Sequence, residues 1–244
     1  MQEEPKTSDT FFEHFAQGDR PTAIGSRLAR VTSLRLFRWL GLGPHARVLE
    51  IGPGRGLFAE LCLEAGLRYV AVEPNATMAA SLEQRGAEVI RERVPPLPRL
   101  EGRFDAVVMI HLVEHLNSMQ EALALTTQVK AVLAPEGKVL VCSPDFLNWR
   151  KHFFNCDFSH NYVTTERRLH QLLLNGGFRH VRSRTLAGPL AGCPAVLVSG
   201  LAALLPFGLL NALLPDSRAA YKLYKMQLTC LRAVAVCGTL EGPL

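Results

Sequence analysis

Two stretches of the chain carry side chains that could move a proton. His111, Glu114 and His115 directly follow an apolar run, and Asp157 and His160 lie close together further along. A histidine with a pKa near neutrality can take a proton from a hydroxyl group, and a nearby carboxylate orients the ring and raises its basicity. His111 and His160, the latter oriented by Asp157, are therefore candidate general bases. The alternative is that Glu114 and His115 only cap a short helix.

A glycine-rich turn near the start of the chain could hold a ligand. Glu50 ends an apolar run, and Gly52, Gly54 and Gly56 follow at alternate positions before an amphipathic segment at 57–61. This order predicts a strand, a tight turn and a helix, and glycines let such a backbone approach a ligand closely. The helix would point the free N–H groups of its first turn at the same ligand.

A second acid stands in a comparable position. Glu73 ends the apolar run at 69–72, 17 residues after Gly56. In dinucleotide-binding folds, an acid at the tip of the second strand, about 20 residues beyond the glycine turn, bonds a ribose hydroxyl. The combination predicts a nucleoside-binding domain. A dinucleotide fingerprint would read Gly-x-Gly-x-x-Gly, whereas the third glycine here comes one residue earlier.

The elements that must position these residues alternate along the chain. Strands are expected at 47–51, 69–73, 87–90, 104–110, 138–142, 178–186 and 227–237. Helices are expected at 22–41, 57–66, 76–85, 119–133 and 164–174, with a long loop at 143–163. After Asp105 the run at 104–110 is wholly apolar, which is typical of a strand buried on both faces of a parallel sheet. The alternation predicts an α/β fold with a doubly wound, mostly parallel sheet.

These motifs together resemble class I S-adenosylmethionine (SAM)-dependent methyltransferases. Glu50 and the alternating glycines match motif I of that family, and Glu73 stands where the family holds the ribose. Residues 104–109 resemble its fourth strand, and residues 133–141 resemble its turn into the fifth. The likeness covers about residues 35–185.

The resemblance implies a fold, a cofactor and a set of binding residues. The sheet would have seven strands, the last antiparallel to the others, with SAM as methyl donor and S-adenosylhomocysteine as product. The residues expected around the cofactor are Glu50, Gly52, Gly54, Gly56, Glu73, Pro74, Asn75, Glu92, Ile110 and His111. Among them, Glu73 would accept from the ribose hydroxyls, and Glu92 would meet the adenine edge. The chain departs from the family at Glu136, where many members have a second glycine in the turn.

A metal site is a further hypothesis for the segment after the fourth strand. His111, Glu114 and His115 form a His-x-x-Glu-His cluster. It resembles the Glu-x-x-Glu-His cluster of ubiquinone-pathway O-methyltransferases and small-RNA 2′-O-methyltransferases, which binds a divalent ion. With His160 it would offer four ligands, and the additional imidazole would favour softer metals than magnesium. The interpretation without a metal is preferred.

Composition limits the classes of function. Hydrophobic residues make up 48% of the 244 residues, enough for a sizeable core. The net charge is +5 with scattered basic residues, so no nucleic-acid interface is expected. The six cysteines form no Cys-x-x-Cys pair and several lie within apolar runs, which indicates reduced thiols in the cytoplasm. The acidic N-terminus does not resemble a signal peptide.

One segment does not fit the methyltransferase pattern. Residues 185–215 contain no charged side chain and are interrupted by several prolines, and basic residues flank them on both sides. We interpret this apolar insertion as helices lying in the interface of a membrane, peripheral to its inner face, with cations on anionic headgroups. A cap over the active site, a dimer contact and a kinked transmembrane span are the alternatives.

The chain is expected to form a single methyltransferase domain, 1–244. An aromatic helix at 10–16 would be a lid over the cofactor or a surface staple. The expected parts are N-terminal helices (1–43), a SAM-binding core (44–186), the apolar helical insertion (187–225), and the last strand with a tail (226–244).

The predicted function is transfer of a methyl group from SAM to a small-molecule acceptor. The apolar insertion favours a lipid, a quinone or a lipid-linked sugar, methylated on oxygen or carbon. A catalytically inactive scaffold protein at a membrane surface is the main alternative, and a nucleotide-linked dehydrogenase is a third. The oligomeric state is left open.

Overall fold

The strands of the sheet form where the apolar runs predict them. The computed structural model describes residues 23–241, so the expected helix at 10–16 lies outside the described residues. The strands are β1 (Arg47–Ile51), β2 (Arg68–Val72), β3 (Glu88–Ile90), β4 (Phe104–Ile110), β5 (Leu133–Pro144), β6 (Arg179–Ala187), β7 (Leu190–Ala191) and β8 (Ala233–Thr239).

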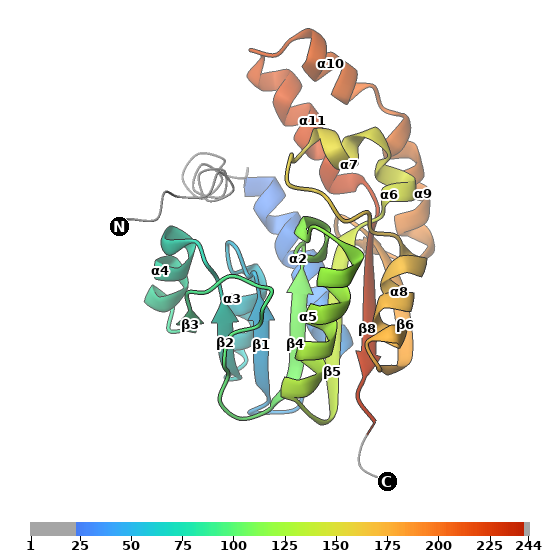
Figure 1. Ribbon diagram of the computed structural model, residues 1–244. Coiled ribbons are helices and arrows are strands. Elements are labelled where there is room, and N and C mark those ends of the chain that lie inside the picture. Colours follow the sequence, from blue (N-terminus) through green and yellow to red (C-terminus); the bar gives the residue numbers. More distant parts are fainter. Residues whose placement is uncertain (1–22, 242–244) are drawn as a thin grey trace, which may run out of the picture.

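The helices alternate with these strands along the chain, as Figure 1 shows. Before the insertion they are α2 (Ala23–Leu40), α3 (Leu57–Glu64), α4 (Ala76–Gln84), the 3-10 turn η1 (Val113–His115), α5 (Met119–Val132), α6 (Phe146–Trp149), α7 (Lys151–Asn155) and α8 (Glu166–Asn175). The insertion adds α9 (Cys193–Leu204), α10 (Phe207–Leu213) and α11 (Arg218–Cys230).

The sheet has the order β3-β2-β1-β4-β5-β8-β6-β7. Strand β1 pairs in parallel with β2 and β4, and β8 lies antiparallel between β5 and β6. This topology confirms the predicted fold, including the antiparallel last strand. The sheet has one strand more than the seven that were expected. The additional strand is the two-residue β7, which forms a short hairpin with β6 at the edge of the sheet.

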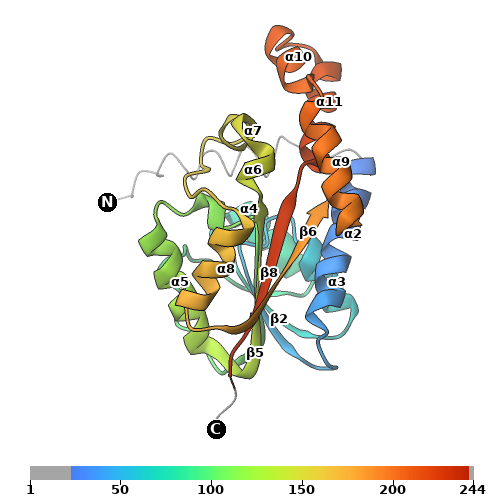
Figure 2. The same ribbon diagram turned by 90° about the vertical axis from the view of Figure 1, so that its right-hand side faces the viewer.

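Helices cover both faces of the sheet (Figure 2), and an apolar layer lies between the sheet and the helices on each face. Side chains of β4 alternate between them, because successive residues of a strand point to opposite faces. Val107 and Met109 join the core that α5 and α8 cover, whereas Ala106 and Val108 join the core under α2 and α3. The strand is therefore buried on both faces, as its unbroken apolar run predicts.

Three details of the sequence-based prediction are corrected. The expected strand at 227–237 begins only at Ala233, because α11 continues to Cys230. The expected loop at 143–163 contains the short helices α6 and α7. Glu136 adopts a φ of 60°, so the turn keeps the left-handed backbone that a glycine would supply more easily.

Buried amide side chains hold α9 against its neighbours, one of them in α6 outside the insertion and the other in α11 within it. The Nδ2 atom of Asn148 in α6 donates to the carbonyl of Ser199 in α9, at 3.1 Å. The Nε2 atom of Gln227 in α11 donates to the carbonyls of Ala202 and Leu205, at 2.8 and 2.7 Å. The C-terminal end of α9 is thus fixed by polar contacts that a loosely attached tail would lack.

We expect Gln227→Ala to lower the free energy of unfolding by about 1–3 kcal/mol, because buried carbonyls lose their donor. Chemical denaturation followed by circular dichroism would measure the change. The matched control is Thr127→Ala, which removes an exposed hydroxyl bonded within α5 and should cost less than about 0.5 kcal/mol. Equal effects of the two substitutions would contradict this account.

Candidate active site

The expected site residues gather at one edge of the sheet. Strands β2, β1, β4 and β5 run parallel as neighbours, so their carboxyl ends meet. The glycine turn follows β1, Glu73 follows β2, and His111 follows β4. Residues far apart in the sequence are therefore brought together at the position where open α/β sheets bind ligands.

The glycine turn leaves open space at one of its three glycines. Gly52, Gly54 and Gly56 all have positive φ angles, of 70°, 53° and 73°. A Cβ atom on Gly54 would meet nothing within 4 Å, whereas one on Gly56 would lie 2.6 Å from the Cδ2 atom of Leu82. Gly56 is thus required by packing, and Gly54 presents bare backbone to the space that a ligand would fill.

Arg85 fixes the outer side of this turn, a role that the sequence did not reveal. Its guanidinium donates to the carbonyl of Arg55 at 3.1 Å and to that of Gly56 at 3.4 Å. The same group pairs with Glu60 at 3.0 Å. Nothing in the sequence distinguishes Arg85 from a solvated arginine, because its partners lie in a different helix and turn.

Glu73 is held beside the glycine turn. Its Oε2 atom accepts from the amide of Gly54 at 3.1 Å, and its Oε1 atom accepts from the amide of Asn75 at 2.9 Å. Burial raises the pKa of Glu73, and these two amide hydrogen bonds oppose the shift. Asn75 also caps α4 by accepting from the amide of Met78, and Pro74 is exposed. The acid and the open glycine therefore border the same space.

Glu50 is the second carboxylate in this part of the site. Its side chain is buried, and the hydroxyl of Tyr69 donates to its Oε2 atom at 2.6 Å. Burial raises the pKa of Glu50 to about 7, the Tyr69 hydrogen bond lowers it, and the charge of Glu73 raises it. A cation bound nearby would favour the ionised form. Tyr69 was not predicted as a site residue, because it reads only as one member of an apolar strand.

The remaining expected cofactor residues differ in how the structure places them. Ile110 ends β4 and is partly buried, and β4 pairs with β1, the strand that precedes the glycine turn. Glu92 lies on the loop after β3, is exposed, and makes no hydrogen bond or ion pair with any residue between 23 and 241. The role of Glu92 at an adenine edge stays a prediction.

His111 and Glu114 form a pair at the end of β4. The Nδ1 atom of His111 lies 3.0 Å from the Oε1 atom of Glu114, whose other oxygen accepts from the hydroxyl of Ser143 at 2.8 Å. His111 has a φ of 53°, and its amide donates to the carbonyl of Cys142 in β5. The turn leaves the imidazole 51% exposed while the Glu114 side chain is fully buried.

The charges of this pair support each other. Burial raises the pKa of Glu114, but the hydrogen bond with His111 and the charges of His111, His115 and His160 lower it to about 2. Desolvation lowers the pKa of His111, and the hydrogen bond and charge of Glu114 outweigh it, so the net shift is upward. Glu114 is therefore an ionised carboxylate that keeps its proton donor in a fixed orientation.

No side-chain hydrogen bond joins Asp157 to His160 in the part of the chain that the structure describes, although the charge of Asp157 acts to raise the pKa of His160. Asp157 accepts from the amide and hydroxyl of Ser159 at 2.9 and 2.6 Å, and the Ser159 hydroxyl lies 2.8 Å from the Nδ1 atom of His115. His160 is 8% exposed and uses its own Nδ1 atom on the carbonyl of Phe153, at 2.6 Å. Burial is the main cause that lowers the pKa of His160. Asp157 thus reaches a histidine through Ser159, and that histidine is His115.

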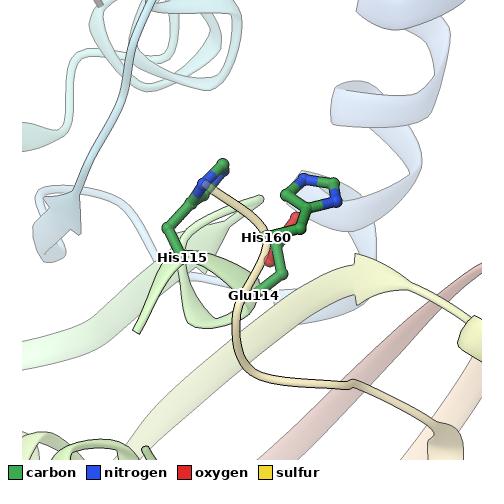
Figure 3. Close-up of side chains that lie close together, drawn as sticks. All are labelled: Glu114, His115 and His160. Atoms are coloured by element: carbon green, nitrogen blue, oxygen red, sulfur yellow. The ribbon is translucent and has the colours of Figure 1, made fainter. Parts of the chain in front are cut away.

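Three donors in this region converge closely enough for a metal ion. Ligand atoms of Glu114, His115 and His160 lie within 4.8 Å of one another (Figure 3). His111 is not part of this group, although its ring pairs with Glu114. Two imidazoles with one carboxylate suit zinc or a similar ion better than magnesium. However, both oxygens of Glu114 already have partners, so the cluster is also satisfied without an ion.

Comparison with known proteins identifies the family. The family model described as "Methyltransferase domain" matches residues 17–183, so the chain belongs to this family. The predicted family is thereby confirmed. Over 109 residues the chain is 30% identical to a ubiquinone biosynthesis O-methyltransferase of Bradyrhizobium sp. (strain ORS 278), covering 43% of this chain and 42% of that protein. The chain thus spans less than half the length of this curated relative.

Solved structures agree with the fold over nearly the whole chain. A SAM-dependent methyltransferase from Archaeoglobus fulgidus superposes with a TM-score of 0.59 at 21% identity, covering 94% of this chain and 98% of that one. The N-methyltransferase NodS from Bradyrhizobium japonicum WM9, crystallised with S-adenosyl-L-homocysteine, gives a TM-score of 0.62 at 14% identity, covering 98% and 100%. At these identities the likeness extends to the fold alone.

We expect Glu50→Gln to stabilise the protein in a pH-dependent manner. Because the folded-state pKa of about 7 exceeds the usual 4.5, the acid costs stability as pH rises from about 4.5 to about 7. The difference corresponds to roughly 3 kcal/mol as an upper figure. The variant should therefore unfold at higher denaturant than wild type at pH 8, and at the same concentration at pH 4.

Denaturation curves at several pH values would measure this gain, with Glu88→Gln, an exposed acid in β3, as the matched control. A gain that does not change between pH 4 and pH 8 would contradict the assigned ionisation of Glu50.

Proposed function

We propose that this protein is a SAM-dependent methyltransferase acting on a small-molecule acceptor. The observation that carries the proposal is the placement of Glu73 against Gly54, with open space above that glycine. An acid at the end of β2 suits the ribose hydroxyls, and bare backbone at the turn suits a ligand that approaches closely. The nearby Glu50 would favour a cationic ligand, as the sulfonium of SAM is.

His111 is the residue that we propose as general base. SAM supplies an electrophilic methyl group, so the chain has to hold the acceptor in line and remove its proton. The Glu114 carboxylate keeps a proton on Nδ1 of His111, which leaves the lone pair of Nε2 for an acceptor hydroxyl. His160 is a weaker candidate because it is buried and bonded to Phe153.

The acceptor that we propose is lipid-like, met at the inner face of a membrane and methylated on oxygen or carbon. Two features support it. The relative from Bradyrhizobium sp. carries the name ubiquinone biosynthesis O-methyltransferase. The insertion places a stretch at Cys193–Leu213 that is long and apolar enough to cross a membrane by length and composition, with a mean hydropathy of 2.1. The break at Pro206 and the flanking cations favour a peripheral contact over a span.

A metal-assisted reaction is the second candidate mechanism, favoured by the convergence of Glu114, His115 and His160. A bound divalent ion would polarise an acceptor oxygen and make its proton easier to lose. The protein's own part would be to orient the two imidazoles through Ser159 and Phe153. Treatment with a chelator separates the mechanisms, since a metal-free base mechanism would keep its activity.

Calorimetric titration with SAM, and separately with NAD, tests the cofactor. We expect SAM to bind and NAD not to bind. Glu73→Ala should weaken SAM binding about 10-fold or more, because the charged acceptor for two hydroxyls is lost. The control is Glu101→Ala, an exposed acid on the loop before β4 with the same change in charge. Absence of SAM binding to the folded protein would favour the scaffold alternative, and NAD binding would favour a dehydrogenase.

Substitution of the base tests the chemistry. We expect His111→Ala to lower kcat about 10²- to 10⁴-fold in a labelled-methyl assay on lipid extracts, the range typical of general-base catalysis. The affinity for SAM should change far less than kcat, because the proposed role of the ring is to remove the acceptor proton. His170→Ala, in α8, is the matched control. A kcat unchanged by His111→Ala would exclude this base.

A further inference from the structure

Helix α9 presents its side chains in the opposite sense to a helix on a water-soluble surface. It buries only small residues, at Ala195, Ser199 and Ala202. Its large apolar residues point outward, with Leu197 69% exposed and Leu204 80% exposed. An ordinary surface helix would bury its leucines and expose polar residues. Small residues at helix contacts and large apolar residues outside are characteristic of helices surrounded by lipid.

The exposed apolar surface continues onto α10. This helix has no buried residue, and Leu209 and Leu213 are 56% and 69% exposed. The same face carries no charged side chain between residues 185 and 215. Because Asn148 and Gln227 fix α9 through buried hydrogen bonds, this apolar surface is a built feature of the fold. We call α9 and α10 together the apolar segment.

A basic cavity lies near the start of the apolar segment and shares no lining residue with the candidate active site. It has a volume of about 250 Å³ and lies between α2 and the β6–β7 edge of the sheet. Its lining combines arginines with apolar and aromatic side chains, and includes no acidic residue: Val31, Leu34, Arg35, Leu36, Arg38, Trp39, Arg184, Leu186 and Ala191.

The arginines of this cavity have no carboxylate partner among the described residues. Arg35, Arg38 and Arg184 make no ion pair with a carboxylate in the part of the chain that the structure describes. Arg184 instead lies over the ring of Trp39, 4.9 Å from its centroid. Guanidinium groups bind phosphate oxygens in bidentate fashion, so this cluster suits a phosphate ester.

The cavity and the apolar segment are adjacent along the chain. Ala191 lines the cavity, and α9 begins two residues later at Cys193. In Figure 2, α2 and the lower end of α9 lie on the same side of the sheet. Arginines at the base of an exposed apolar helix place positive charge where lipid headgroups meet acyl chains.

We propose that this cavity binds the phosphate headgroup of an anionic phospholipid, and that the lipid's acyl chains lie along the exposed leucines of α9. The inference rests on the membrane contact in the proposed function, and it names the lipid class that the contact requires. The combination of arginines with apolar and aromatic side chains matches an amphiphile with one phosphate. Neither feature alone would select it, because leucines alone bind any bilayer and arginines alone bind any anion.

Vesicle flotation of the full chain tests this assignment. The vesicles are phosphatidylcholine alone, or phosphatidylcholine with a minority of phosphatidylglycerol. The variant is Arg35→Gln/Arg38→Gln/Arg184→Gln, and the control is Arg68→Gln/Arg99→Gln/Arg167→Gln, which removes the same charge from exposed positions elsewhere. At about 1 kcal/mol per arginine near an anionic surface, the variant should bind phosphatidylglycerol vesicles about 100-fold more weakly than wild type. The control should lose much less.

The outcomes distinguish the cavity as a specific site, the membrane contact and the lipid as ligand. Equal weakening of variant and control would overturn the cavity as a specific site while leaving membrane contact in place. Failure of the wild type to float with either vesicle would reject membrane contact and this inference together. If the wild type binds soluble glycerol phosphate and the arginine variant does not, while both bind vesicles equally, the cavity would be assigned to a free phosphate ester and the lipid would be overturned. SAM titration of each variant verifies the fold and bears on methyl transfer independently of all three results.

Discussion

The buried carboxylate of Glu114 is the interaction on which the acceptor side of the site depends. Its side chain joins His111 after β4 to Ser143 in β5, and its backbone carbonyl accepts from the amides of Asn161 and Tyr162. Three segments that are distant in the sequence thus meet at one residue with no exposed side-chain surface. A buried charge is costly unless it is paired, so loss of any partner would disturb the others.

The two buried carboxylates of the site illustrate how partners decide ionisation. Glu50 has a neutral hydroxyl as its hydrogen-bond donor, and burial leaves its pKa near 7. Glu114 has imidazoles around it, and its pKa falls to about 2 despite equal burial. The first acid can still gain from a cation, whereas the second already has its counter-charge. The cofactor side is therefore electrostatically incomplete and the acceptor side is complete.

The fold was largely predictable because its signals are local. Apolar runs and glycine stops locate β1 and β4 to the residue, and the Glu73 spacing indicates the cofactor side. What could not be predicted depends on contacts across the fold. Asp157 and His160 are close in sequence, yet the Asp157 carboxylate accepts from the amide of Ser159. Aspartate side chains readily form such local hydrogen bonds with the backbone two residues further on. Likewise, Arg85 gains its role only when α4 packs against the glycine turn.

The position of β8 affects how the protein assembles during synthesis. This strand lies near the C-terminal end of the chain but sits between β5 and β6, so those two strands cannot share a sheet until it has been made. During synthesis the apolar segment leaves the ribosome before β8 does. The leucines of this segment are then exposed while the edges of β5 and β6 are still unpaired. Early encounter with a lipid surface or a chaperone would shield that intermediate. The order of elements in the gene thus makes the last strand the step that closes the fold.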